Sequence, residues 1–167
     1  MDFATLNAAQ PLPRADAAFC CLGTTIKKAG SQVAFRAVDY EAVLRFAQAA
    51  KAGGTERLFV VTARGADAAS WIFYNRVKGE VEAALGALEL ATLGIARPSL
   101  LLGDRSDPRP LERLAVTVSR RLSPIMAPLG ARPIEARTVA RALIAMAETP
   151  AQGTRAYDNS TLHAMGR

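Results

Sequence analysis

The sequence predicts an α/β protein with a doubly wound parallel sheet, and two observations support this fold class. Three short apolar runs recur along the chain, at residues 17–22, 57–62 and 92–97, and each has the length and continuity of a strand buried on both faces. The segments between them show the apolar spacing of helices. Strands that alternate with crossover helices form a parallel sheet, because a parallel pair cannot be joined by a tight turn.

The expected elements follow in chain order. The first strand, AAFCCL, ends at Gly23, and the first crossover helix runs from about Val33 into AAKAGG, where the glycine pair supplies the C-cap. The second strand, RLFVVT, leads to a helix for which Ser70 suits the N-cap. The third strand, TLGIAR, is stopped by Pro98. The second helix is expected to place one apolar stripe on the sheet: Ile72, Phe73, Val77, Val81, Ala84, Leu85 and Leu88.

The segment after Pro98 is expected to hold a basic helix at 110–122, a proline-punctuated stretch at 123–134 and a last helix at 136–148. Open parallel sheets bind ligands outside the carboxyl ends of their strands. We therefore interpret this part as a small helical C-terminal cap over a pocket mouth. The whole chain, 1–167, is then a single domain.

Composition agrees with one globular domain, because 50% of the 167 residues are apolar. No run approaches the roughly 20 apolar residues of a membrane span, and the N-terminus lacks the basic-then-apolar order of a signal peptide. The sequence therefore predicts a cytoplasmic protein without a membrane segment.

A net charge of +6 raises the question of nucleic-acid binding. The basic residues are scattered from Arg14 to Arg167, which argues against a phosphate track. Arg105, Arg109 and Arg113 come nearest to a patch, but acidic residues lie between them, as is typical of a solvated helix face. Nucleic acid is therefore not expected as a partner.

Cysteines and histidines are too few for a disulfide framework or a metal site. Cys20 and Cys21 are the only cysteines, and neighbours in a strand point to opposite faces, so both are expected to be packing residues. His163 is the only histidine, which excludes a multi-histidine zinc site and leaves any Ser-His triad dependent on this one residue.

Tyr74 and Lys78 carry the clearest chemical signal. They lie four residues apart on the second crossover helix and so face the same side. A tyrosine with the ordinary pKa of about 10 is a poor acid or base at neutral pH, and a nearby cation is expected to lower that pKa. The phenol could then exchange a proton with a hydroxyl or carbonyl. The spacing alone is equally typical of a half-buried tyrosine beside a solvated lysine.

Three longer strings carry a resemblance that covers nearly the whole chain: FCCLGTTIKKAGS, VVTARGADAASWIFYNRVKGEVEAAL and IARPSLLLGDR. Together they resemble the atypical short-chain dehydrogenase/reductases, in the branch that includes the Tat-interacting tumour-suppressor protein and its bacterial oxidoreductase and epimerase-like relatives. The resemblance implies a Rossmann-like sheet that binds NADP or NAD.

The resemblance also implies roles for residues at matching positions. Tyr74 matches the family's proton donor, and Lys78 matches the lysine that holds the nicotinamide ribose and tunes the tyrosine. Thr62 aligns with the family's serine at the end of its strand, where a threonine hydroxyl can still donate a hydrogen bond. At position 63 this sequence has an alanine where the family often has a second serine. The implied catalytic residues are therefore Tyr74, Lys78 and Thr62.

Most of the implied cofactor-binding residues lie in the loops that come directly after the first and third strands. Asp39 lies near the position of an active-site asparagine in many relatives of the wider superfamily, although a helix-capping or surface carboxylate is the other interpretation. The turn after the first strand matches the one that passes the cofactor's ribose, and the loop after the third strand matches the one beside the nicotinamide. The implied cofactor-binding residues are Gly23, Thr24, Thr25, Lys78, Pro98 and Ser99.

One part of the family pattern does not occur in the sequence, namely the Gly-x-Gly-x-x-Gly motif. MDFATL resembles the tail of the family's third strand, so the fold is expected to be truncated at its N-terminus, without its first βα units. A late-assigned start, a decayed gene and a genuine short protein remain open as explanations. The apolar edge left beside AAFCCL is expected to seek a partner, and a homo-oligomer is one such arrangement.

Two functions remain in competition. The first is an NAD(P)-dependent oxidoreductase, or a nucleotide-sugar-epimerase-like protein, that acts on a carbonyl or alcohol of unknown identity and is impaired in this form. The second is a regulatory or interaction protein that binds the cofactor without chemistry, which Thr62 and Asp39 both favour.

Overall fold

The computed structural model describes residue 6, residues 9–102 and residues 132–167. Its main sheet has four parallel strands in the order β1-β2-β3-β6. These strands are β1 (Ala18–Cys20), β2 (Arg57–Val61), β3 (Thr92–Ala96) and β6 (Gly153–Tyr157). The predicted parallel α/β sheet is confirmed, and the three expected strands are all present.

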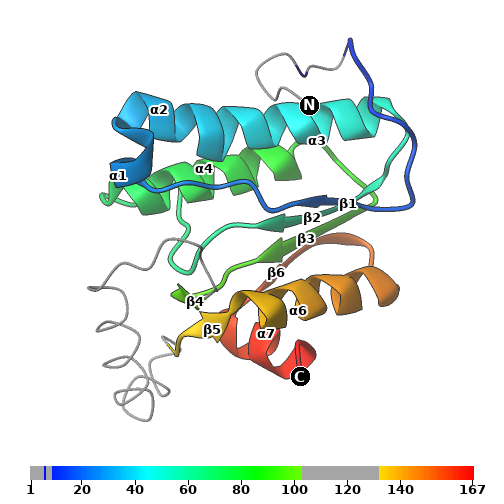
Figure 1. Cartoon of the computed structure of the whole chain (residues 1–167). Coiled ribbons are helices and arrows are strands. Elements are labelled where there is room, and N and C mark those ends of the chain that lie inside the picture. The colour runs from blue at the N-terminus through cyan, green and yellow to red at the C-terminus, as the bar shows by residue number, and fades with distance from the viewer. Residues whose placement is uncertain (1–5, 7–8, 103–131) are drawn as a thin grey trace.

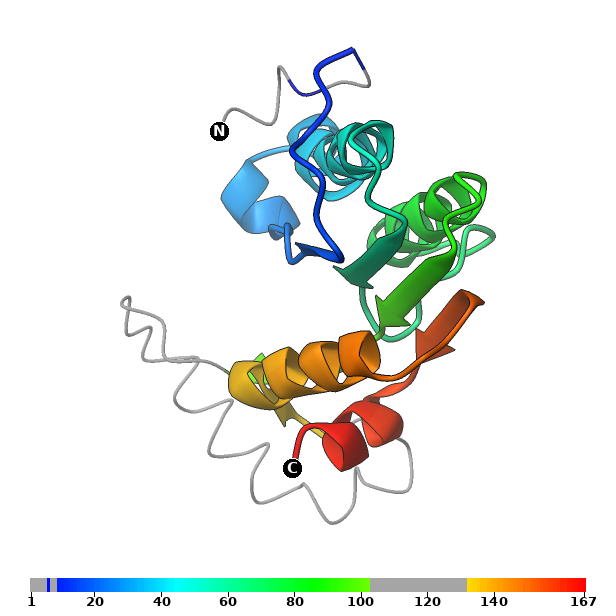
Figure 2. The ribbon, with the colours of Figure 1, turned by 90° about the vertical axis from the view of Figure 1, so that its right-hand side faces the viewer.

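Helices cover both faces of this sheet (Figures 1 and 2). On one face lie α3 (Val43–Ala52) and α4 (Phe73–Gly86), and on the other lie α6 (Ala136–Glu148) and α7 (Asn159–Met165). The fold is therefore doubly wound, as predicted, and α6 has the bounds expected for the last helix. These C-terminal helices pack on the sheet itself.

Two apolar clusters fill the space between the sheet and its two helical layers, because the strand residues point alternately to the two sides. Under α6, Phe59 stacks on Phe19 with ring centroids 5.3 Å apart. Gly94 on β3 leaves room for this ring, since a Cβ there would come within 2.5 Å of Phe59 Cδ1. The cluster under α3 and α4 is formed by Cys20, Val43, Ala47, Leu58, Val60, Val81, Leu85, Leu93 and Ile95.

The first crossover helix is divided into three parts. It begins as α2 (Gln32–Arg36), continues as a π-helical segment η1 (Ala37–Ala42) and ends as α3, with Gly53 at its C-cap. A short helix α1 (Ile26–Ala29) precedes it. The sequence predicted the helix and its end, but the π-helical segment is a departure from the expected period of 3.6 residues.

The second crossover helix starts later than expected. Ser70 is not its N-cap; α4 begins at Phe73, and the Ser70 hydroxyl instead accepts a hydrogen bond from the Ile72 amide at 3.2 Å. Ile72 is consequently 62% exposed and not part of the buried stripe. Cys21 is also exposed, contrary to its expected packing role, whereas Cys20 is buried.

Four further elements were not expected from the sequence. They are β6 and α7 after the last predicted helix, and a small two-stranded sheet formed by β4 (Leu101–Leu102) and β5 (Ile134–Glu135). The predicted basic helix at 110–122 and most of the proline-punctuated stretch at 123–134 lie outside the described residues.

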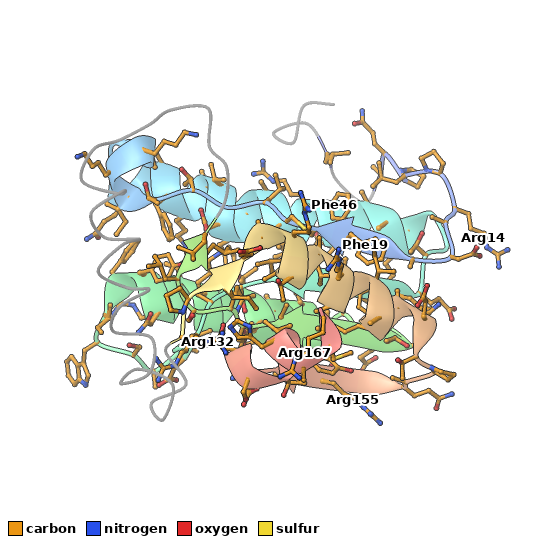
Figure 3. The ribbon with its side chains drawn as sticks, turned by 60° about the horizontal axis from the view of Figure 1, so that its bottom comes forward. Arg14, Phe19, Phe46, Arg132, Arg155 and Arg167 are labelled. Atoms are coloured by element: carbon orange, nitrogen blue, oxygen red, sulfur yellow. The ribbon has the colours of Figure 1, made fainter. Side chains whose placement is uncertain are left out.

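Figure 3 labels four arginines from different segments of the chain: Arg14 lies at the right-hand end of the view, and Arg132, Arg155 and Arg167 lie along its lower side. No helix in the described ranges has the length and apolar character needed to cross a bilayer.

Candidate functional site

The candidate site lies at the edge of the sheet where the parallel strands end. The pairing registers align Cys20 with Val60, Val61 with Ala96, and Ala96 with Tyr157, so all four strands reach nearly the same level. In Figure 1 the arrows of β2 and β3 point to this edge, which also holds α1 and the start of α4. The loops that leave the strand ends therefore converge here, as expected for a ligand site of this topology.

Lys78 and Asp39 form a buried ion pair at this edge. Lys78 Nζ lies 2.7 Å from Asp39 Oδ1, and the two side chains are only 5% and 0% exposed. The interpretation of Lys78 as a solvated neighbour is therefore wrong, and so is that of Asp39 as a surface or capping carboxylate. Burying two charges is costly unless each is satisfied, so the surrounding fold must hold both side chains in place.

Tyr74 lies one turn before Lys78 on α4, as predicted, and its ring packs against Phe35 with centroids 5.6 Å apart. The expected lowering of its pKa is wrong. Burial raises the pKa of Tyr74, and the negative charge of Asp39 raises it further. The charge of Lys78 is paired with Asp39, so it does not favour the phenolate as the sequence suggested. At neutral pH the phenol therefore holds its proton.

The turn after β1 connects directly to this ion pair. The Thr24 amide donates a hydrogen bond to Asp39 Oδ2 at 2.9 Å, and the Thr25 side chain caps α1 by accepting from the Lys28 amide. A Cβ placed on Gly23 would lie 3.4 Å from Asp39 Oδ1 and 3.7 Å from Lys78 Nζ. The missing side chain thus leaves a space that opens onto both charges.

A nicotinamide ribose fits this arrangement in two respects. The space at Gly23 gives a ligand access to the Lys78 ammonium. Asp39 Oδ1 is buried 2.7 Å from Lys78 Nζ, and a carboxylate oxygen can accept a second hydrogen bond, here from a ligand hydroxyl. The three residues Gly23, Asp39 and Lys78 could therefore hold a sugar diol.

The Thr62 side chain contacts Glu82. Its hydroxyl lies 2.6 Å from Glu82 Oε1, to which it donates a hydrogen bond, and Glu82 in turn pairs with the guanidinium of Arg97. Thr62, Glu82 and Arg97 thus join the ends of β2 and β3 to α4. In this state the threonine hydroxyl supports the helix that carries Tyr74.

The loop after β3 is held by α7. The Ser99 amide donates to Asn159 Oδ1 at 2.9 Å, and the Asn159 amide group donates to the Arg132 carbonyl at 2.8 Å. Pro98 is tied to the loop after β2, because its carbonyl accepts from the Arg64 amide at 2.8 Å. Pro98 and Ser99 therefore lie at the strand-end edge, as the cofactor-loop expectation requires.

Three residues of this region escaped sequence reasoning or were misplaced by it. Glu82 continues the four-residue spacing of Tyr74 and Lys78, a signal that could have identified it. Asn159 follows a strand that has no apolar run, and the burial of Asp39 depends on the π-helical segment, so neither had a local signal. Within the described residues, no group of three His, Cys, Asp or Glu side chains is arranged to hold a metal ion.

Sequence relatives agree with the motif resemblance. Rat Protein HTATIP2 is 45% identical over 116 residues, which are 69% of this chain and 48% of the relative. This similarity is consistent with the resemblance of the chain to the atypical short-chain dehydrogenase/reductases. Protein FMP52, mitochondrial, of Candida glabrata is 42% identical over 89 residues, 53% of this chain and 38% of the relative. No protein-family model matches this chain.

The chain spans about half, or less, of the length of the curated relatives it matches. The relatives also contradict the cytoplasmic expectation. The proteins from Candida glabrata, Emericella nidulans and Coccidioides immitis are all named as mitochondrial, so the cytoplasmic assignment is wrong on this evidence.

Solved structures confirm the Rossmann-like fold of this chain. MoeE5 in complex with UDP-glucose and NAD gives a TM-score of 0.66 at 14% identity, covering 99% of this chain and 66% of that chain. The human epimerase family protein SDR39U1 with NADPH gives 0.60 at 16% identity, covering 95% and 61%. At these identities the similarity concerns the fold alone.

Proposed function

We propose that this chain is part of an NAD(P)-dependent oxidoreductase, or an epimerase-like relative of one, that acts on a carbonyl or alcohol. The observation that carries the proposal is the placement of Lys78, which is buried beside the space at Gly23 and one helical turn from Tyr74. The similarity to rat Protein HTATIP2 supports it. The titles of structural neighbours support it as well: RMD from Pseudomonas aeruginosa complexed with NADPH has a TM-score of 0.58 at 16% identity and covers 86% of this chain and 60% of that chain.

In this proposal the residues bind, orient and move a proton. Lys78 and Asp39 would hold the ribose diol beside Gly23, and Pro98 and Ser99 would contact the nicotinamide. The bound cofactor supplies the hydride that is exchanged with the substrate carbon. The Tyr74 phenol gives its proton to the carbonyl oxygen, so a carbonyl gains one hydride and one proton and becomes an alcohol.

A nucleotide titration tests the cofactor site without requiring a substrate. The fluorescence of NADPH is followed as the whole chain is added, first with wild type and then with Gly23→Val. The backbone at Gly23 is outside the left-handed region, and a Cβ there would already be in van der Waals contact with Asp39 Oδ1 and Lys78 Nζ, so a valine side chain would occupy the space next to Lys78. We expect at least tenfold weaker binding for Gly23→Val, and unchanged binding for Gly86→Ala, where nothing lies within 4 Å of the new Cβ.

The chemical part of the proposal depends on Tyr74. Tyr74→Phe removes only the hydroxyl, so we expect nucleotide binding to persist and carbonyl reduction to fall by at least a hundredfold. Reduction by Tyr74→Phe at the wild-type rate would refute the catalytic role.

A non-catalytic cofactor-binding protein is the second candidate, and two observations favour it. The Thr62 hydroxyl is engaged by Glu82, and the charge of Lys78 is paired with Asp39. This candidate predicts NADPH binding that Gly23→Val weakens, together with a turnover indistinguishable from zero that neither Lys78→Ala nor Tyr74→Phe changes.

A further inference from the structure

The loop between β2 and α4 exposes two large apolar side chains next to each other. Trp71 is 98% exposed, so nearly all of its indole lies in water, and Ile72 beside it is 62% exposed. Single exposed apolar residues are normal on a protein surface, whereas adjacent large ones mark interaction sites. The Trp71–Ile72 pair is therefore a candidate docking surface.

The loop that carries this pair is fixed to α4 by its own hydrogen bonds. Arg76 Nη1 donates to the Ser70 carbonyl at 3.0 Å, and its guanidinium lies over the Phe73 ring, 5.7 Å from the centroid. The Asp67 amide donates to the Asn75 carbonyl at 3.0 Å. The backbone is thus held on both sides of the pair, and the fold itself keeps the indole in water.

Basic side chains predominate at the end of the molecule that holds this pair. The loop lies at the strand-end edge, as does α1 (Figure 1), and α2 joins the two because Phe35 packs on Phe73 with ring centroids 5.8 Å apart. Asp67 accepts a hydrogen bond from the Ala69 amide within the loop. The charged residues of α1, of residues 62–72 and of the first turn of α4 are Lys27, Lys28, Arg64, Asp67 and Arg76, so four of the five are basic.

We propose that the Trp71–Ile72 pair docks this chain on the surface of an anionic lipid bilayer. Tryptophan suits the boundary between lipid and water, because its ring is apolar and its N–H is polar. Anionic headgroups attract lysine and arginine, and the whole chain has a net charge of +6. A second copy of the chain fits this end less well, since a symmetric contact would place basic residues against basic residues.

The proposal involves neither Tyr74 nor a cofactor, so it stands apart from the proposed function. It can be tested directly, because Trp71 is the only tryptophan in the sequence and its fluorescence reports this position alone. The emission of the whole chain is recorded as vesicles of phosphatidylcholine and phosphatidylglycerol in equal parts are added. We expect the emission to shift to shorter wavelength and to be quenched by brominated acyl chains. Vesicles of phosphatidylcholine alone, or high salt, should give weaker binding, because the attraction is electrostatic and salt screens it.

Ile72→Asp tests the contribution of the apolar pair while leaving the tryptophan in place. Ile72 is the N-cap of α4, where aspartate is a preferred residue, so the variant should keep the start of the helix. The loss of one buried isoleucine side chain should weaken vesicle binding by about tenfold. Ile144→Asp is the matched control, because Ile144 is a 53% exposed isoleucine on α6, at the other face of the sheet. It should bind the vesicles as wild type does.

Three results would overturn the proposal. The first is an emission spectrum that does not change when the anionic vesicles are added. The second is equal vesicle binding by Ile72→Asp and Ile144→Asp. The third is a shift to shorter wavelength that appears without vesicles as the protein concentration rises, because a second copy of the chain would then cover Trp71.

Discussion

Gly79 on α4 offers a direct test of how the helix carrying Tyr74 is seated. A Cβ at this position would lie 2.1 Å from the Ala68 nitrogen and 2.2 Å from the Asp67 carbonyl carbon. Both are backbone atoms of the loop after β2, so no side-chain rotation relieves the clash. The loop would have to retreat by about 1 Å to reach even the shortest separation that real Cβ atoms show.

The expected cost follows from this geometry. Overpacking a tight contact costs about 1–3 kcal/mol, and a rigid backbone neighbour places Gly79→Ala at the upper end. Replacing glycine by alanine in a helix returns up to about 1 kcal/mol. We therefore expect the free energy of unfolding to fall by about 2 kcal/mol, which corresponds to roughly 4–8 °C in Tm for a chain of this size.

Gly86→Ala is the matched control on the same helix, because its Cβ would meet nothing within 4 Å. It should gain stability by up to about 1 kcal/mol, so the two variants should differ by about 3 kcal/mol in urea unfolding followed by circular dichroism. Equal stabilities for the two variants would refute the close seating of the loop on α4.

Three other changes test separate contacts. Thr62→Val should lower the free energy of unfolding by about 1–3 kcal/mol, because it removes the buried hydroxyl that donates a hydrogen bond to Glu82. Thr62→Ser keeps a hydroxyl and should retain most of the wild-type stability. A valine variant as stable as wild type would contradict this. Hydrogen bonds at the start of α7 lower the pKa of Asp158. The ionised Asp158 carboxylate therefore stabilises the fold fully above the ordinary carboxyl pKa, and this stabilisation is lost as the pH falls through the lower pKa of the folded state. Asp158→Asn should have a lower Tm than wild type at pH 7 and the same Tm in strong acid. The exposed Cys21 should react with a thiol reagent in the native protein, and the buried Cys20 only after denaturation, because burial raises the pKa of Cys20 to about 11. Reaction of both thiols in the native protein would contradict this.

The parts of the fold that the sequence predicted are those with a strong local pattern. β2 and β3 are continuous apolar runs, because both faces of a central parallel strand are covered by helices. β6 was missed since it lies at the edge of the sheet and all but its last residue are exposed, so GTRAY contains no apolar run. Ser70 was misjudged as the N-cap because Ile72 was interpreted as the first residue of the apolar stripe, whereas it is exposed.

The same contrast between features with and without a local sequence pattern holds for the candidate site. Spacing placed Tyr74 and Lys78 on one helix, but their electrostatics depend on Asp39, which lies 39 residues from Lys78 in the sequence. The spacing of residues along the sequence does not indicate that a carboxylate on another helix forms an ion pair with Lys78. Thr62 was found by its position at a strand end, yet the partner of its hydroxyl, Glu82, is fixed only by the packing of α4 on the sheet.

The π-helical segment has a geometric consequence for the whole first crossover helix. Phe35, Asp39, Val43 and Ala47 follow one another at four-residue intervals, and all four are buried. In an uninterrupted α-helix each such interval overshoots a full turn by about 40°, so the last of the four would be rotated by about 120° from the first. The wider turn at Ala37–Ala42 takes up part of this rotation. Deleting one residue there would force the chain to choose between directing Asp39 at Lys78 and directing Val43 and Ala47 at the sheet.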